Sequence, residues 1–378
     1  MGTRPRVAVE VRPEGVVAAR AEVGAGLLAA ISRGDLATGA LRPGLKAGNI
    51  LDRAAVVLAV RRVLDGIAAR GGERSRYVTL VIPDTAVRVL LLDFDALPTK
   101  PVEALAVVRF RLKKLLPFDA EHAVVTYQVM SSGRDGVRVL AVAMPCDVLS
   151  EYEGVVTDAG YLPGAVLPST LAALAGLDSI ETGPALVVNA GQDAVTTAIV
   201  QGGVLLLHRN VDLGSEMGGE EAEGVEVRGG GSSLGRPAQS SVVETAWMLG
   251  ERAELDRMDA GAQMQAQVLR RADMTLPSEP DEAVQVLNAT EPVSTGREIT
   301  QAVSVAAAYF EDTLGGAPPV VLAAGSLGAE RLGAVLGMYG MDGMQVREIV
   351  DTAAIGPGAG TAVISRGLLA GVRGALRS

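Results

Sequence analysis

Two short segments carry polar residues in an arrangement that could bind a phosphate and a metal ion. In VAVEVRPEGVVAARAE (residues 7–22), two strand-like runs flank a turn, and Glu10 precedes that turn. In VVNAGQDAVTTAIVQGG (residues 187–203) the pattern recurs, with Asn189 before the turn and Gly191 in it. Backbone N–H groups of glycine turns can bind phosphate oxygens, and an acid at a strand end can hold Mg²⁺ through water. The two segments therefore predict a cleft between two related halves of the chain.

A third segment could complete such a cleft. Two residues of the first two segments, Arg12 and Asn189, make the cleft less suited to a phosphate and a metal ion. VVLAAGSLGAERLGAVL (residues 320–336) reads as a strand, a turn at Gly325 and Ser326, and a helix, which could lie against an adenine and its ribose. In the first turn, the long side chain of Arg12 and the rigid proline after it hinder close approach of the backbone to a phosphate. Asn189 is neutral and therefore a weaker anchor for Mg²⁺ than a carboxylate. We expect nucleotide hydrolysis to be absent or very weak.

Few other residues have the chemistry of a catalytic or metal site. The chain has two histidines, His122 and His208, and one cysteine, Cys146. A metal site requires more clustered ligands than these, and Ser169 and Ser326 have no neighbouring base in the sequence. We therefore predict no catalytic residue and no metal ligand. The single cysteine excludes a disulfide within the chain and suits a reducing compartment.

The composition is that of a large globular protein. The chain has 378 residues, of which 48% are hydrophobic, 21% charged and 3% aromatic, so two domains with cores of Ala, Val and Leu are expected. A net charge of −10 argues against nucleic-acid binding, which needs a basic surface. The first residues lack the pattern of a signal peptide, and no apolar run is long enough to span a bilayer. We therefore expect a cytoplasmic protein.

The elements that would position these residues occur in two similar sets, judged by apolar alternation and helical spacing. Strands are expected at residues 7–11, 16–22, 77–82, 87–94, 124–130, 137–144, 185–189, 194–200, 204–210 and 320–323. Helices are expected at residues 52–69, 100–116, 149–159, 167–177, 242–271, 297–314, 327–336 and 360–378. Because the hairpin recurs after nearly half the chain, we interpret the pattern as the duplication of a whole lobe.

The predicted domains follow from this duplication. The first lobe would span residues 1–180 and the second residues 181–378. Within the second lobe, residues 215–295 are rich in Gly, Ser, Pro and acidic residues. Such a composition predicts a flexible insertion.

Four stretches, in their order along the chain, resemble a known family. RFRLKKLLPFDAEHAVVTYQVM (residues 109–130) combines a basic helix, a Leu-Pro-Phe turn, acidic residues and a strand. The others are ALVVNAGQDAVTTAIVQGGVLLLHRNVDLG (185–214), REITQAVSVAAAYFED (297–312) and IGPGAGTAVISRGLLAG (355–371). Their order resembles the PilM family of type IV pilus proteins, which belongs to the actin-like ATPase superfamily. The resemblance covers most of the chain, but residues 215–295 fit it poorly.

The resemblance implies an α/β fold of the actin-like, ribonuclease H-like type, with two duplicated lobes and a nucleotide-type cleft between them. It also implies ATP with Mg²⁺ as the cofactor of that cleft. The matching cofactor-binding positions are Glu10, Arg12, Asn189, Gly191, Gly325 and Ser326. The family's first hairpin has an Asp-x-Gly pattern, from which Glu10 and Arg12 depart, so a degenerate cleft is expected.

The resemblance also implies a partner. PilM-like proteins bind the short cytoplasmic tail of PilN, an inner-membrane protein, in a groove beside an inserted subdomain, here at about residues 95–165. An extended tail can bind in an apolar groove or along a strand edge. The predicted contact residues are Val89, Leu91, Leu116 and Phe118. We therefore expect a cytoplasmic scaffold of the pilus assembly complex that is peripheral to the inner membrane through its partners.

Three other functions of the same superfamily stay open. An active ATP-dependent enzyme, such as a sugar kinase, would need an acid near the cleft as general base. The cytoplasmic domain of a type II secretion protein is normally followed by a membrane span, and an actin-like division protein forms filaments with ATP. For the last helix (residues 360–378) the resemblance predicts packing in the second lobe, whereas its apolar face and arginines also fit a membrane-surface helix.

Overall fold

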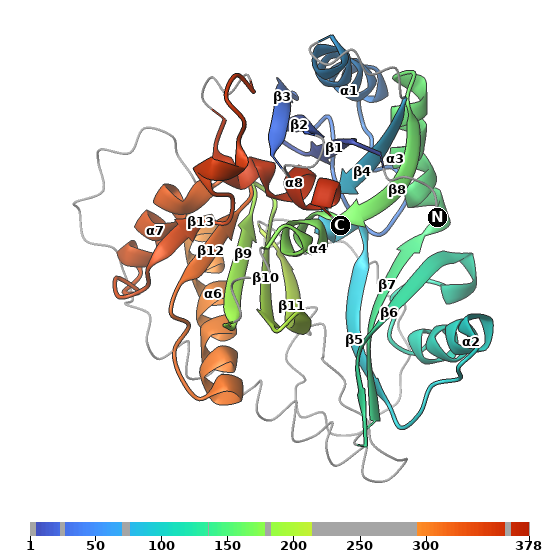
Figure 1. The fold of residues 1–378 in the computed structure, drawn as a ribbon, viewed down its shortest axis with the longest axis vertical. Coiled ribbons are helices and arrows are strands. Elements are labelled where there is room, and N and C mark those ends of the chain that lie inside the picture. Colours follow the sequence, from blue (N-terminus) through green and yellow to red (C-terminus); the bar gives the residue numbers. More distant parts are fainter. Residues whose placement is uncertain are drawn as a thin grey trace, which may run out of the picture.

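In the computed structural model, the chain forms two lobes, each built on a sheet, and a smaller third sheet (Figure 1). The structure describes residues 5–22, 27–69, 76–134, 136–177, 183–213, 293–359 and 364–377. The predicted helix at 242–271 lies outside the described residues, as does nearly all of the predicted insertion at 215–295.

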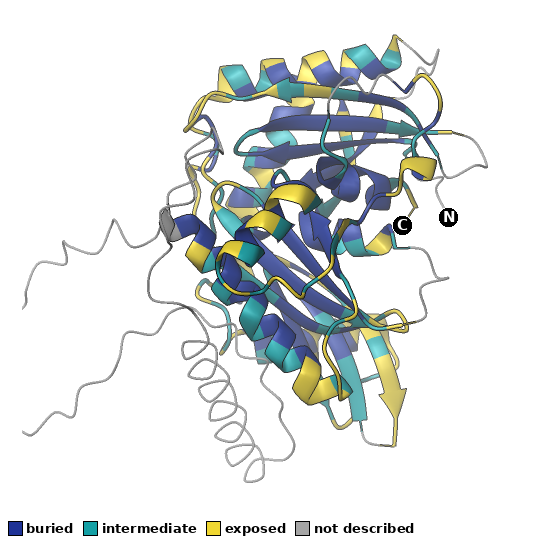
Figure 2. Cartoon of the chain, turned by 90° about the vertical axis from the view of Figure 1, so that its left-hand side faces the viewer, coloured by how far each residue is buried: buried dark blue, intermediate teal, exposed yellow. Residues whose placement is uncertain are grey.

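The first lobe is built on a five-stranded sheet with the order β3-β2-β1-β4-β8. Its strands are β1 (Val7–Arg12), β2 (Gly15–Ala21), β3 (Leu28–Asp35), β4 (Tyr77–Ile82) and β8 (Leu162–Pro168). β1 and β2 form the predicted antiparallel hairpin, and β4 runs parallel to both β1 and β8. The central strands are buried on both faces, as Figure 2 shows in dark blue, which explains their continuous apolar runs.

Several helices cover this sheet. α1 (Arg53–Ala68) packs on β2 and β3, and the side chain of Asp52 caps its first turn. α3 (Cys146–Asp158) packs on α1 and β8. α4 (Ser169–Ala175) begins directly after β8, so the start of the predicted helix at 167–177 belongs to a strand. β8 contains two prolines and lies at the sheet edge, where missing N–H groups are tolerated.

A three-stranded sheet with the order β5-β7-β6 extends from the first lobe (Figure 1). It consists of β5 (Arg88–Phe94), β6 (Ala123–Gly133) and β7 (Gly136–Pro145), with α2 (Pro101–Leu112) packed on one face. That face has its own apolar core, which includes Leu90, Leu92, Val108, Leu112 and Val139. The alternate residues of β5, Val89 and Leu91, point the other way and join the core of the first lobe.

The second lobe repeats the plan of the first. Its sheet has the order β11-β10-β9-β12-β13, with β9 (Ala185–Ala190), β10 (Ala194–Gln201), β11 (Val204–Asp212), β12 (Val321–Ala324) and β13 (Val346–Glu348). β9 pairs antiparallel with β10 and parallel with β12, just as β1 pairs with β2 and β4. α6 (Val293–Leu314) and α7 (Gly328–Met338) complete this lobe. The predicted duplication of the hairpin is therefore confirmed by the strand order.

The last helix, α8 (Ala370–Arg377), leaves the second lobe and packs in the first (Figure 1). It lies against α4, β1, β2 and β4, and Val372 and Ala375 are buried in the core of the first lobe. The expectation that this helix packs in the second lobe is therefore wrong. Its apolar face is covered by protein, which argues against the membrane-surface interpretation. Within the described ranges, no helix combines the length and apolar character needed to cross a bilayer.

Glycines allow α8 to approach α4 and β1 very closely. A Cβ atom on Gly374 would overlap the carbonyl oxygen of Ala172, and one on Gly371 would overlap the carboxylate of Glu10. Gly176, at the end of α4, would place a Cβ atom 3.2 Å from the Cα of Gly374. These glycines lower the helix propensity of α8, yet the contact between two backbones requires them.

Gly374→Ala should lower the free energy of unfolding by about 1–3 kcal/mol, because the added methyl group forces α8 away from α4. Gly316→Ala is the control, since a Cβ atom there meets nothing within 4 Å. Urea denaturation of the two variants measures the difference. Equal unfolding midpoints would mean that the close packing of α8 contributes nothing to stability.

Candidate functional site

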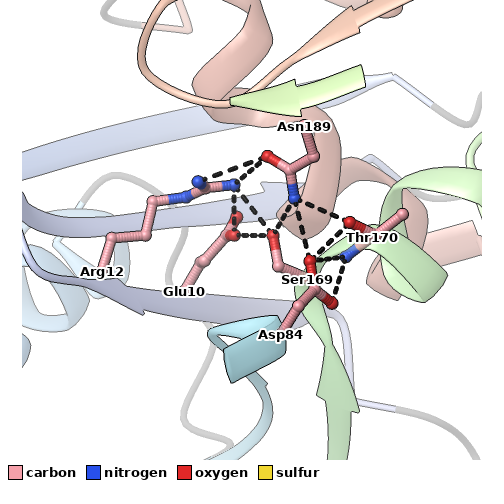
Figure 3. A network of polar contacts seen from close by, with 6 residues as sticks. All are labelled: Glu10, Arg12, Asp84, Ser169, Thr170 and Asn189. Atoms are coloured by element: carbon pink, nitrogen blue, oxygen red, sulfur yellow. Dashed lines mark hydrogen bonds and ion pairs between the residues drawn. The ribbon is translucent and has the colours of Figure 1, made fainter. Parts of the chain in front are cut away.

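The ends of β1 and β9 meet in the interior, where the two lobes are in contact (Figure 3). Six buried polar side chains form one network there: Glu10, Arg12, Asp84, Ser169, Thr170 and Asn189. They come from β1, from the short 3₁₀ helix after β4, from the start of α4 and from β9. Buried polar groups are stable only when they are hydrogen-bonded, so their contacts decide what the site can do.

The Arg12 guanidinium is at the centre of the network. Its Nη2 lies 2.7 Å from Glu10 Oε1 and donates to Ser169 Oγ at 2.9 Å. Asn189 Oδ1 is 3.4 Å from Nη2 and 3.5 Å from Nη1. The Ser169 hydroxyl in turn donates to Glu10 Oε1 at 2.6 Å. One cation therefore joins β1 of the first lobe to β9 of the second.

The Asn189 amide connects this cation to a second buried carboxylate. Its Nδ2 donates to Ser169 Oγ at 2.9 Å and to Thr170 Oγ1 at 3.0 Å, and lies 3.4 Å from Asp84 Oδ2. Asp84 also accepts hydrogen bonds from the N–H and the hydroxyl of Thr170. Because an amide is both an acceptor and a donor, Asn189 can face a guanidinium on one side and a carboxylate on the other.

Strand geometry places these side chains together. Glu10 and Arg12 are two residues apart on β1 and therefore project from the same face. β4 and β8 are parallel neighbours whose last residues are paired. The residues that follow them, Asp84 and Ser169, therefore emerge at the same edge of the sheet. The network thus depends on the order of the strands as well as on residue types.

Burial and neighbouring charges act in opposite directions on the ionisable groups. Burial raises the pKa of Glu10, while Arg12 lowers it. Burial alone would lower the pKa of Arg12, but the neighbouring acids, Glu10 first, raise it above its ordinary value. Burial lowers the pKa of the adjacent His208, against the attraction of Asp84. The neighbouring acids therefore favour the charged form of Arg12, whereas burial disfavours the charged form of His208.

Among the cavities lined by described residues, two lie at the cleft between the lobes, beside the turns of the two hairpins. The first, of about 460 Å³, adjoins the polar network. The second, of about 700 Å³, is lined by Ser326 and by the first residues of α7. Glu14, Gly191 and Gln192 line both cavities. The turns of the two hairpins thus separate the first cavity from the second.

The first cavity is rich in acids. Carboxylates outnumber guanidiniums in its lining, with Glu14, Asp84, Asp193 and Asp212 against Arg12 and Arg42. Burial, assisted by the charge of Glu14, raises the pKa of Asp193, while Arg42 opposes this rise. A phosphate in this cavity would meet like charges, which repel it. Acidic side chains therefore predominate over basic ones in this half of the cleft.

The two predicted glycine turns differ in how strictly they need glycine. Gly325 has a φ of +89°, and a Cβ atom there would lie 2.7 Å from Asn189 Oδ1 and would overlap the Ala190 carbonyl. Its N–H donates to the carbonyl of Gly367 at 2.9 Å. At Gly191, by contrast, a Cβ atom would lie 3.7 Å from its nearest neighbour, an ordinary contact. Gly325 is therefore needed to pack the end of β12 on β9.

The side chains present do not fit a bound Mg²⁺. Mg²⁺ requires about six oxygens in an octahedron, whereas Glu10 Oε1 and both oxygens of Asp84 already have partners. The other Glu10 oxygen, Oε2, is buried against Gly371 without a hydrogen-bond partner. In the part of the chain that the structure describes, no group of three or more His, Cys, Asp or Glu side chains is arranged to hold a metal.

The four residues predicted to bind a partner lie in two separate places. Val89 and Leu91, on β5, are only 5% and 6% exposed and belong to the core of the first lobe. Leu116 and Phe118 follow α2 and are half-buried against the core of the three-stranded sheet. The two pairs lie on opposite faces of that sheet and do not line one groove.

Two central residues of the network, Asp84 and Thr170, are absent from the predicted site, and Ser169 is predicted to lack a nearby base. A signal is present in the sequence, because Asp84 and Ser169 each follow an apolar run that ends in proline. Adjacent parallel strands place the residues that follow them at one edge of the sheet. The sequence does not reveal β8 as a strand, however, because its prolines and glycine are untypical of strands.

Comparison with known proteins identifies the fold. No family profile and no curated protein matches the sequence. Among solved structures, the chain is similar to a "PilM-PilN type IV pilus biogenesis complex", with 16% identity, a TM-score of 0.63 and coverage of 98% of both chains. The chain has the fold of that pilus protein. The predicted actin-like α/β fold with two duplicated lobes is therefore confirmed, and the predicted resemblance to PilM is confirmed at the level of the fold.

Two further solved structures score lower than this one. The cytoplasmic domain of EpsL, an inner-membrane component of the type II secretion system of Vibrio cholerae, has 15% identity and a TM-score of 0.35, with coverage of 55% of this chain and 70% of that chain. The ethanolamine utilization protein EutJ from Carboxydothermus hydrogenoformans has 11% identity and a TM-score of 0.41, with coverage of 99% and 89%. Both TM-scores are too low to establish a shared fold.

Gly325→Ala should destabilise the protein by about 1–3 kcal/mol, because its positive φ and its crowded surroundings both disfavour a side chain. Gly191→Ala, in the turn between β9 and β10, should change the free energy of unfolding by less than about 0.5 kcal/mol. Urea denaturation of both variants compares the two turns. A similar loss from both would mean that close packing does not distinguish them.

Proposed function

We propose that this protein is a cytoplasmic scaffold of a type IV pilus-type assembly complex, in which it binds the N-terminal tail of a PilN-like membrane protein. The observation that carries the proposal is the similarity to the PilM–PilN biogenesis complex, which extends over 98% of both chains. A similarity of this extent includes the three-stranded sheet as well as the two lobes. In this proposal the partner holds the protein at the inner membrane.

The three-stranded sheet offers a strand edge to an extended tail. β6 has a strand neighbour on one side only among the described strands. Val124 and Val129 on β6 are 39% and 44% exposed. An edge strand with exposed apolar side chains suits a peptide that binds by adding a strand. We therefore place the tail along β6 and not on Val89 and Leu91, which are buried.

We also propose that the cleft of this scaffold is degenerate. ATP hydrolysis needs a positioned water or hydroxyl and a metal ion that offsets the charge of the phosphates. Here Glu10 is paired with Arg12, and Asp84 accepts hydrogen bonds from Thr170. The acids of the first cavity also oppose phosphate binding. These contacts support a cleft that does not turn over ATP and disfavour a sugar kinase-like enzyme.

A fluorescent peptide with the tail sequence of the PilN-like partner should bind with micromolar affinity. Val124→Glu should weaken this binding about tenfold or more, because it places a charge in an apolar contact. Fluorescence anisotropy measures both affinities.

Leu58→Glu is the matched control, because Leu58 lies on α1 and is 44% exposed, close to the exposed fraction of Val124. It should leave the affinity unchanged. Absence of binding at high micromolar peptide would contradict the proposed partner, and an equal loss from both variants would contradict the β6 edge as its place.

The purified protein should release no more phosphate from Mg²⁺-ATP than a protein-free sample does, because both carboxylates of the network have partners. A colorimetric phosphate assay tests this. Turnover that requires Mg²⁺ and is lost in Asp84→Asn would show that the cleft is active.

A further inference from the structure

The Arg12 guanidinium is surrounded by oxygens from three segments of the chain (Figure 3). Glu10 Oε1 and Ser169 Oγ lie 2.7 Å and 2.9 Å from Nη2. Asn189 Oδ1 follows at 3.4 Å. Carboxylate, amide and hydroxyl oxygens are hard ligands of the kind that bind Mg²⁺. All four residues are buried, so the arrangement differs from an exposed ion pair, whose charges remain hydrated.

The charges around Arg12 are also those of a cation site. Glu10 and Asp84 are two buried acids in one network, close enough that the charge of Asp84 adds to the rise in the pKa of Glu10. Arg12 supplies positive charge next to Glu10, and Asn189 turns its oxygen toward Arg12. Removing one partner of a buried pair leaves an uncompensated charge. Without Arg12, the Glu10 carboxylate, the Ser169 hydroxyl and the Asn189 amide oxygen would line the vacated space, and the charge of Asp84 would act on it from nearby.

We infer that the Arg12 guanidinium occupies the position of a divalent cation in this cleft, and that removing it creates a site that binds Mg²⁺ or Mn²⁺. The inference deepens the proposed degenerate cleft and rests on it, because it names what has replaced the metal. Its consequence is that contact between β1, α4 and β9 requires neither a metal nor a nucleotide. The arrangement of the two lobes is then a fixed property of the chain.

An alternative is that Glu10 and Arg12 form a purely structural ion pair. Removing Arg12 would then destabilise the protein in the same way with and without a divalent cation. The inference predicts instead that a divalent cation restores part of the lost stability, because the same oxygens would bind it. The response of an Arg12 variant to Mg²⁺ therefore separates the two explanations.

The experiment compares melting temperatures in millimolar MgCl₂ and in EDTA at equal ionic strength. The wild-type protein should melt at the same temperature in both. Arg12→Gly should melt at a lower temperature in EDTA, and Mg²⁺ or Mn²⁺ should raise its melting temperature by about 3 °C or more. The double variant with Glu10→Gln and Arg12→Gly should lose this rise, because it lacks one of the proposed ligands.

Three outcomes would overturn the inference: no cation effect on Arg12→Gly, an equal effect on the double variant, or stabilisation of the wild type by Mg²⁺. If Arg12→Gly does not fold, Mn²⁺ binding to the wild type and to Glu10→Gln, measured by electron paramagnetic resonance, can still overturn the inference. No tight site is expected in either protein. A wild-type Mn²⁺ site that Glu10→Gln abolishes would contradict the inference. These measurements do not depend on ATP turnover, so the inference and the proposed degenerate cleft can fail separately.

Discussion

The buried ion pair between Glu10 and Arg12 is the interaction on which the contact between the lobes depends. Removing a carboxylate and a guanidinium from water is costly, and hydrogen bonds from the polar groups around them offset part of that cost. Ser169 and Asn189 provide these partners, since the hydroxyl donates to Glu10 and the amide oxygen faces Arg12. Ser169 belongs to α4 and Asn189 to β9. The hydrogen bonds of one ion pair therefore hold elements of both lobes in place.

The two copies of the hairpin have diverged in complementary directions. β1 and β9 hold equivalent places in their sheets, yet one presents the acid Glu10 and the other the amide Asn189. An aspartate in place of Asn189 would lie near Asp84, where two negative charges would repel each other. The amide instead donates toward Asp84 and accepts from Arg12. The acid in one hairpin and the amide in the other therefore both suit the Arg12 guanidinium, which contacts side chains of both lobes.

The sequence predicts elements better than it predicts contacts between them. The hairpins and α1 are recognisable because apolar periodicity is local, whereas the three-residue strand β13 is too short to show a period. The same limit applies to the site. From the sequence, Arg12 is interpreted only as a residue that impairs the first turn, because its partners Ser169 and Asn189 are distant in the sequence. Likewise, Gly374 reads as a weak point of a helix until the backbone that it touches is known.

The placement of α8 also affects the order in which the protein can fold. The core of the first lobe contains β1 together with Val372 and Ala375 of α8, which are separated by most of the sequence. During synthesis, β1 leaves the ribosome long before α8 does. Independent domains can fold one after another as they emerge, but this first lobe lacks part of its core until α8 has been made. The first lobe therefore matures only after the second has been synthesised, and for most of translation it exposes an apolar surface that a chaperone can bind.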